Sequence, residues 1–221
     1  EKNLDSSNLR ILDASWYLPN QKRDPINEFR ERHIPGAQFF DIDVFSDKSR
    51  SLPHMAPSED YFISQLKTLG IGDEHHVIVY DGSGLFSAAR AWWLFKLFGK
   101  SNVSILDGGF PKWYEENKPF SDVIPSFSNR SLCTKYNPEM VSGWQEVLHA
   151  SKFGGKQIID ARSEDRFKGR VQEPRAGLRS GHIPGSTNIC FTEILNPNQT
   201  VRRISEIESI FLKKGIDIKK P

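Results

Sequence analysis

Residues 33–37 (HIPGA) and residues 182–186 (HIPGS) are two copies of one short motif, and their first residues are 149 positions apart. A second matching pair precedes them, residues 11–14 (ILDA) and residues 158–161 (IIDA), whose aspartates are 147 positions apart. Two motifs repeated in one order at nearly one offset indicate an internal duplication. We therefore expect two copies of one fold, each beginning with a short buried strand.

Apolar runs and turn signals alternate through the first copy. Residues 77–80 (VIVY) end in the turn signal of residues 81–84 (DGSG), and a helical stretch follows from Ser87 to Phe98. Another apolar run at residues 103–106 (VSIL) also ends in a turn, before a further helix start. Short strands that alternate with helices predict an α/β fold, in which each copy has a mostly parallel sheet flanked by helices.

The domain boundaries follow from the repeat and from a change in composition. Residues 121–137 lie in a stretch rich in serine, proline and asparagine, which is typical of a linker. We therefore place the first domain at residues 1–120 and the second at residues 138–221. A shift of about 148 positions puts the counterpart of Asp81 near position 229, beyond Pro221. The second domain is thus expected to be truncated, without its copy of this loop.

The composition excludes several classes of protein. Hydrophobic residues make up 37% of the 221 residues and charged residues 26%, as in an ordinary globular protein. The net charge is only +2 with no long basic run, which argues against nucleic acid as a partner. Two cysteines cannot build a disulfide framework, and no apolar run is long enough to cross a membrane. We expect a cytoplasmic protein, with mitochondria as the alternative because residue 1 is not methionine.

Three further segments accompany the repeated motif. They are residues 79–81 (VYD), residues 90–93 (RAWW) and residues 106–109 (LDGG). In this order the motifs resemble the tandem-domain rhodanese-like sulfurtransferases, and the resemblance covers nearly the whole chain. It implies two rhodanese-like domains, of which the first is catalytically silent. The second domain of that family carries a nucleophilic cysteine in a short loop between a strand and a helix, and Asp81 occupies the matching place in the first domain.

The branch of the family is indicated by residues that the chain retains. The Glu-Pro-Arg sequence ending at Arg175, together with Arg166 and His54, is similar to the branch that uses 3-mercaptopyruvate. The resemblance implies that Arg166 and Arg175 bind the substrate, and a guanidinium matches the carboxylate of a keto acid geometrically. It also implies that Asp43 and His54 handle a proton together with a hydroxyl of the absent loop.

The expected reaction moves sulfur from 3-mercaptopyruvate to a thiol or cyanide acceptor through a cysteine persulfide. Thioredoxin is one candidate acceptor, and the C-terminal segment that the chain lacks is an expected partner of the second domain. Thiosulfate sulfurtransferase is the alternative within the enzyme class, and a non-catalytic rhodanese-like binding module is the alternative outside it. Retention of Arg166 and Arg175 favours the enzyme. No cofactor is expected.

The remaining histidines and cysteines have simpler interpretations. His33 and His182 occupy the same place in a repeated motif, which favours a hydrogen-bonding role at the turn over a metal site. No histidine or cysteine cluster has metal-ligand spacing, so no metal is expected. Cys133 falls in the linker and Cys190 in an apolar stretch, where we expect a buried and inert thiol. Neither cysteine is therefore our candidate nucleophile.

Overall fold

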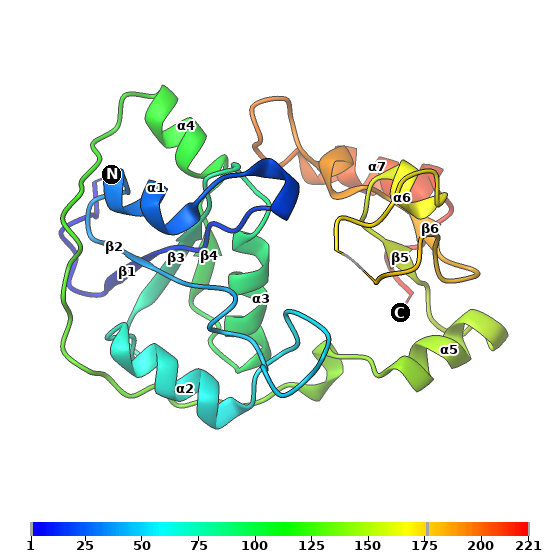
Figure 1. Ribbon diagram of the computed structural model, residues 1–221, viewed down its shortest axis with the longest axis horizontal. Coiled ribbons are helices and arrows are strands. Elements are labelled where there is room, and N and C mark those ends of the chain that lie inside the picture. The colour runs from blue at the N-terminus through cyan, green and yellow to red at the C-terminus, as the bar shows by residue number, and fades with distance from the viewer. Residues whose placement is uncertain (1, 176, 221) are drawn as a thin grey trace. The chain divides into compact units, whose positions relative to one another are not determined.

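The computed structural model describes residues 2–175 and 177–220 (Figure 1). The chain forms two compact units, one of Glu1–Tyr17 with Gln21–Met140 and one of Leu18–Asn20 with Val141–Pro221. The elements are, in chain order, β1 (Leu9–Asp13), η1 (Pro19–Gln21), α1 (Pro25–Glu31), β2 (Ala37–Phe39), α2 (Glu59–Thr68), β3 (His76–Tyr80), α3 (Ala88–Leu97), β4 (Val103–Ile105), α4 (Gly109–Glu115), η2 (Pro138–Met140), α5 (Trp144–Phe153), β5 (Ile159–Asp160), α6 (Glu164–Phe167), β6 (Thr187–Asn188), η3 (Phe191–Ile194) and α7 (Ile204–Lys213), where η marks a 3₁₀ helix.

The first unit is built on a four-stranded parallel sheet in the order β2-β1-β3-β4. The central strand β1 pairs with both neighbours, so that Ile11 lies opposite Ala37 on one side and Ile78 on the other. Parallel neighbours require crossover connections, and helices supply them here. The observed unit is therefore the predicted α/β fold with a mostly parallel sheet flanked by helices.

Helices cover both faces of this sheet (Figure 1). Side chains alternate between the faces of a strand, so Ile11 and Leu12 point to opposite sides. Ile11 packs with Phe29 of α1 and Trp113 of α4, whereas Leu12 belongs to a larger cluster that includes Phe95 of α3 and buried side chains of α2. The carboxyl ends of β1 and β3 thus lie between two packed layers, which hold the loops that follow them in place.

The second unit repeats the beginning of the first. Strand β5 pairs with β6 in parallel, and Asp160 lies opposite Asn188 just as Asp13 lies opposite Phe39. The two HIPG motifs precede β2 and β6, and both close a turn whose glycine has a positive φ, 79° at Gly36 and 81° at Gly185. Glycine adopts this conformation without steric cost, which explains its place in the motif. The internal repeat is therefore structural as well as sequential.

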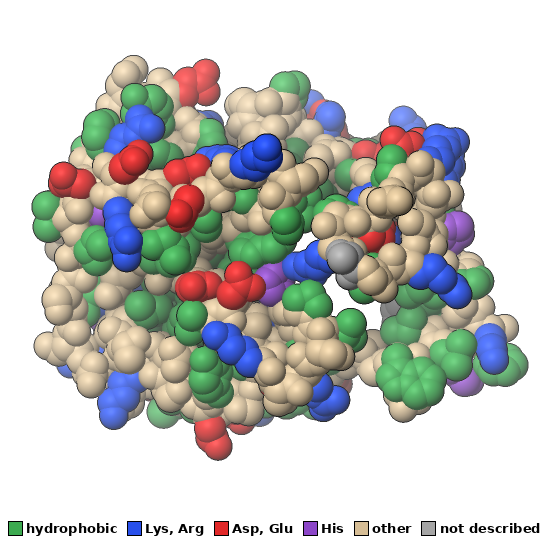
Figure 2. Space-filling view, in the orientation of Figure 1, with side chains coloured by type: hydrophobic (Ala, Val, Ile, Leu, Met, Phe, Trp, Pro, Cys, Tyr) green, Lys and Arg blue, Asp and Glu red, His purple; other side chains and the backbone are tan. Residues whose placement is uncertain are grey.

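The second unit buries fewer large apolar side chains than the first. Trp144 and Phe153 of α5 and Ile204 and Leu212 of α7 are 71–76% exposed. Hydrophobic side chains accordingly appear at the surface over α5 (Figure 2). Among the described residues this unit has a two-stranded sheet, and these helices leave part of their apolar faces in solvent.

The segment at residues 121–137 has almost no regular secondary structure, as its composition indicates. It packs on the first unit, because Lys135 donates its backbone N–H to Phe98 and the side chain of Leu132 is only 6% exposed. By its contacts, the first unit therefore extends to Met140, and the second unit resumes at Val141. The segment connects the two units and is also part of the first.

Asp13, at the carboxyl end of β1, is a buried carboxyl group. Ser15 donates its backbone N–H to Asp13 Oδ1 over 2.9 Å, and the Ser15 hydroxyl donates to the same oxygen. Burial raises the pKa of Asp13 to about 6, although the hydrogen bonds from Ser15 act in the opposite direction. The carboxyl group of Asp13 therefore binds its proton more tightly in the folded chain than in the unfolded chain, where its pKa is near 3.8.

We expect Asp13 to make the first unit less stable as pH rises. The stabilisation from its proton is complete below the unfolded pKa and is lost as pH rises through the folded pKa, that is, between about pH 4 and pH 6. At roughly 1.4 kcal/mol per pKa unit, the free energy of unfolding changes by about 3 kcal/mol. Asp13→Asn should abolish this part of the pH dependence. Urea titrations followed by tryptophan fluorescence across this pH range measure the free energy of unfolding, and Asp5→Asn, at an exposed position, is the control. If the free energy of unfolding of Asp13→Asn depends on pH as steeply as that of the wild type, the prediction is wrong.

Candidate active site

Asp43 and His54 lie on the long connection between β2 and α2, and the structure brings them together. His54 Nε2 and Asp43 Oδ1 are 2.8 Å apart. The His54 side chain is 18% exposed and the Asp43 side chain 63%, so the pair is accessible from solvent. His54 has a φ of 58°, in the left-handed region, where only a few residue types are comfortable. An imidazole oriented by a carboxylate is a suitable proton donor or acceptor near neutral pH.

Two residues that sequence reasoning missed hold this pair. Trp16, just after β1, donates its indole N–H to Asp43 Oδ2 over 3.2 Å, and its ring meets the His54 ring edge-on at 4.9 Å. Arg90 of α3 donates to the carbonyl of His54. Trp16 follows the central strand of the sheet and Arg90 belongs to a helix packed on that sheet, so these two residues tie the loop to the packed part of the unit. The only signal for them in the sequence is the position of Arg90 in the RAWW segment.

The loop after β3 converges on the carboxylate of Asp81. This side chain is fully buried, and it accepts backbone N–H bonds of 2.8 Å from Ser83, Phe86 and Ala88. Three donors directed at one point form a site for an anion. In the first unit, Asp81 itself supplies that anion.

In the second unit, a chain of charged groups surrounds Glu173. Its carboxylate is only 3% exposed and accepts hydrogen bonds from Arg162 and from Arg166, each 28% exposed. Arg166 approaches with both Nε and Nη2, the latter at 2.5 Å. The hydrogen bond from Arg166 is the main cause that lowers the pKa of Glu173, with Arg162 contributing. Arg162 also binds Asp160 at the end of β5 through two nitrogens, which anchors the chain of charges to the sheet.

The Glu-Pro-Arg segment therefore has two parts with different contacts. Glu173 orients the guanidinium of Arg166, a contact that sequence reasoning missed although Glu173 belongs to the motif. Arg175 follows two residues later and is half-buried. Fixing Arg166 on Glu173 lowers the entropy that would be lost on binding a carboxylate.

The two motif histidines make hydrogen bonds, as we predicted, but the partners of their Nδ1 atoms are backbone carbonyls that precede the HIPG turn. His33 Nδ1 lies 2.7 Å from the carbonyl of Phe29, and His182 Nδ1 lies 2.7 Å from the carbonyl of Phe167. Each imidazole also stacks on the phenylalanine that supplies the carbonyl. Within residues 2–175 and 177–220, no group of three or more histidine, cysteine, aspartate or glutamate side chains could hold a metal ion.

One expectation about the cysteines is wrong. Cys190 is half-buried rather than buried, because it lies where the chain leaves β6 for η3, and its Sγ is 3.1 Å from Thr192 Oγ1. Cys133 is exposed, and its backbone N–H donates to Asp73. A neighbouring carboxylate disfavours a thiolate, and Asp73 raises the pKa of Cys133.

In the described part of the chain, no helix is long and apolar enough to cross a membrane.

Comparisons with known proteins agree with the fold and the motifs. Residues 1–116 match the model of the rhodanese-like domain. The chain is 44% identical to 3-mercaptopyruvate sulfurtransferase of Rattus norvegicus, over 98% of this chain and 73% of the rat protein. It is 41% identical to thiosulfate/3-mercaptopyruvate sulfurtransferase 1, mitochondrial, of Arabidopsis thaliana, over 99% of this chain and 63% of the plant protein.

A solved structure is similar over the whole chain. The crystal structure of SseA from Escherichia coli, described as a 3-mercaptopyruvate sulfurtransferase with the rhodanese fold, matches with a TM-score of 0.90 and 38% identity. The match covers 100% of this chain and 82% of the SseA chain. The resemblance drawn from the repeated motifs is thus confirmed by sequence and by structure, and the chain belongs to the rhodanese-like sulfurtransferase family.

Proposed function

We propose that this protein transfers sulfur from 3-mercaptopyruvate to a thiol or cyanide acceptor through a cysteine persulfide. The observation that carries the proposal is the contact between Glu173 and Arg166, because it presents an oriented guanidinium in the same segment as Arg175. Mercaptopyruvate carries a carboxylate beside a carbonyl, and fixed guanidinium donors recognise that pair of groups. Arg166 and Arg175 are the proposed substrate-binding residues.

The proposed chemistry begins with a thiolate that attacks the sulfur of mercaptopyruvate. The sulfur–carbon bond breaks, the enzyme gains a persulfide, and the electron pair remains on the three-carbon fragment as the enolate of pyruvate. That enolate needs one proton to become pyruvate. The Asp43–His54 pair is the proposed source, since its hydrogen bond of 2.8 Å keeps the imidazole in one orientation. The acceptor then removes the outer sulfur, and thioredoxin is one candidate among dithiols.

The proposed nucleophile is a cysteine in the counterpart of the Asp81 loop, which the repeat spacing puts beyond Pro221. Support comes from the first unit, where three backbone N–H groups converge on the Asp81 carboxylate. A thiolate at that point of the second copy would accept the same donors, which lower the pKa of a thiol. We propose that the first domain is catalytically silent because Asp81 has no thiol to offer. The proposed compartment is the cytoplasm or the mitochondrion.

Donor preference tests the proposed function. We expect kcat/KM for 3-mercaptopyruvate to exceed that for thiosulfate by roughly tenfold to a hundredfold, because thiosulfate lacks the keto-acid head that the arginines bind. The measurement is pyruvate release from one donor and thiocyanate formation from the other, on a protein that includes the segment following Pro221. The 221-residue chain is the matched control and should release no pyruvate.

Each other outcome of this assay has a definite meaning. A preference for thiosulfate would support the alternative donor. No activity on either donor, in a protein with the following segment, would support a binding module. Pyruvate release by the 221-residue chain alone would overturn the assigned nucleophile and direct attention to the half-buried Cys190.

A further inference from the structure

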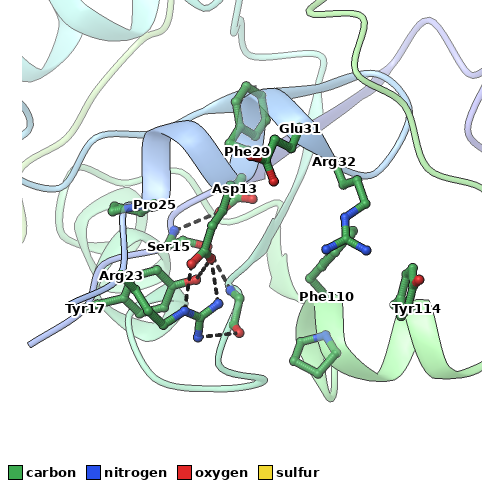
Figure 3. Close-up of a pocket in the computed structure, with 13 residues that line it drawn as sticks. Asp13, Ser15, Tyr17, Arg23, Pro25, Phe29, Glu31, Arg32, Phe110 and Tyr114 are labelled. Carbon is green, nitrogen blue, oxygen red and sulfur yellow. Dashed lines mark hydrogen bonds and ion pairs between the residues drawn. The ribbon is translucent and has the colours of Figure 1, made fainter. Parts of the chain in front are cut away.

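A cavity of about 350 Å³ lies in the first unit at the carboxyl ends of β1 and β3 (Figure 3). Its lining includes Asp13 and Ser15, which end and follow β1, Gly82 after β3, and residues of α1 and α4. Asp43 and His54 are not among the residues that line it, so this cavity is separate from the candidate active site.

The position of the cavity in the sheet favours ligand binding. In the order β2-β1-β3-β4, the chain moves outward from β1 to β2 in one direction and from β3 to β4 in the other. The gap between β1 and β3 is therefore the point where the strand order reverses. In open parallel sheets, ligands bind outside the carboxyl ends of the strands at this point.

The floor of the cavity is rigid and polar. The Ser15 hydroxyl donates to the buried carboxylate of Asp13 and accepts the Gly82 N–H at 2.8 Å, so it links the ends of the two strands. A Cβ at Gly82 would lie 2.2 Å from the Tyr17 hydroxyl oxygen, so a larger residue there would displace the Tyr17 side chain from the cavity wall. Burial raises the pKa of Asp13 to about 6, and buried carboxyl groups that face cavities are frequent in binding sites.

On one wall of the cavity, the charged side chains of Arg23 and Glu28 pair with each other. Glu28 accepts a hydrogen bond of 2.7 Å from the Tyr17 hydroxyl and two from Arg23, at 2.8 and 2.6 Å. The Arg23 guanidinium also stacks on the Tyr17 ring at 3.8 Å. Arg23 and Glu28 are thus engaged with each other, and they shape the cavity rather than offer charge to a ligand.

Three charged side chains of the lining remain for a ligand. Glu31 and Arg32 lie at the end of α1, and within the described residues neither has an ion-pair partner. The third is Asp13 at the floor, a buried carboxylate that already accepts hydrogen bonds from Ser15 at Oδ1. The Arg32 guanidinium lies 5.1 Å from the centre of the Tyr114 ring and points toward the space beside Phe110 (Figure 3). The cavity therefore combines carboxylates, one guanidinium and aromatic surface.

We propose that this cavity binds a small zwitterion of the amino-acid class. Its ammonium group lies toward Asp13 and Glu31, its carboxylate lies toward Arg32, and its side chain lies against the aromatic surface of Phe110 and Tyr114. A guanidinium binds a carboxylate through parallel hydrogen bonds, and carboxylates in the lining attract an ammonium group. The volume is that of a site for a small molecule.

Titration calorimetry with three probes tests this site: L-alanine carries both charges, propionate lacks the ammonium group, and ethylamine lacks the carboxylate. We expect L-alanine to bind at least tenfold more tightly than either single-charge probe, and Arg32→Ala to weaken its binding roughly tenfold to a hundredfold. Arg30→Ala is the matched control, because Arg30 is on the same helix and outside the lining. Arg32 is exposed, so its replacement should leave the fold intact.

The remaining outcomes overturn the proposal. If L-alanine produces no heat at millimolar concentrations, the cavity is not an amino-acid site. If propionate binds as tightly as L-alanine, the site recognises an anion only. If Arg32→Ala and Arg30→Ala bind L-alanine equally well, the binding occurs elsewhere on the protein. These results are distinguishable from a failure of the proposed sulfur transfer, because the lining of this cavity includes none of Asp43, His54, Arg166 and Arg175.

Discussion

Replacing His54 with asparagine is expected to lower kcat on 3-mercaptopyruvate by about a hundredfold or more, with little change in KM. The proposed role of His54 is to supply a proton to the departing enolate, and that transfer belongs to the transition state. Asparagine is the informative substitution because it tolerates the left-handed φ of 58° at this position. The variant therefore removes the imidazole without straining the loop that carries it.

A matched set of variants separates catalysis from structure. Asp43→Asn should have a smaller effect than His54→Asn, and the double variant should be little worse than His54→Asn, because the carboxylate acts through the imidazole. His149→Asn, on exposed helix α5, is the control and should match the wild type. Steady-state kinetics measured across a range of pH give kcat and KM for each variant. A rise in KM with unchanged kcat would show that His54 positions the substrate instead.

Replacing Arg175 with alanine is expected to reduce kcat/KM on 3-mercaptopyruvate roughly tenfold to a hundredfold, and to reduce it less on thiosulfate. The loss of one charged contact with the keto-acid carboxylate costs about 1.5–3 kcal/mol. Arg175 is a cleaner test than Arg166, because Arg166→Ala would also take a partner from the buried carboxylate of Glu173. A loss of activity in that variant would combine binding with stability.

Arg179→Ala is the control for this experiment, since Arg179 is an exposed arginine four residues further along. It should leave kcat/KM on both donors unchanged. Pyruvate formation and thiocyanate formation are measured on the same preparations. They give, for each donor, the ratio of kcat/KM in the variant to kcat/KM in the wild type. If Arg175→Ala reduces kcat/KM equally on both donors, or on neither, this arginine does not select the keto acid.

The strands and the repeated turn could be predicted because their signals are local. The run at residues 77–80 became β3, and the helical stretch from Ser87 to Phe98 became α3 with both residues as its caps. The two HIPG motifs close equivalent turns because a glycine with positive φ is a property of a few neighbouring residues. The equal registers of β1–β2 and β5–β6 follow from the same short segments.

The linker shows where local signals stop. Residues 121–137 have almost no regular secondary structure, but the segment packs on the first unit with Leu132 in its core. Cys190 was expected to be buried because apolar residues surround it in the chain, but it is half-buried at a turn. Burial depends on which distant surfaces meet, and sequence neighbours do not report this.

The sequence by itself determined that this chain is a duplicated α/β protein of the rhodanese-like type, because repeats, strand patterns and turn glycines are encoded within short segments. Only the tertiary structure decided that Asp43 meets His54, that Glu173 orients Arg166, and that a cavity opens between β1 and β3. Each of these joins residues whose separation along the chain carries no information about their distance in space. Packing of the helices on the sheet sets those distances, and the chemistry of the protein depends on them.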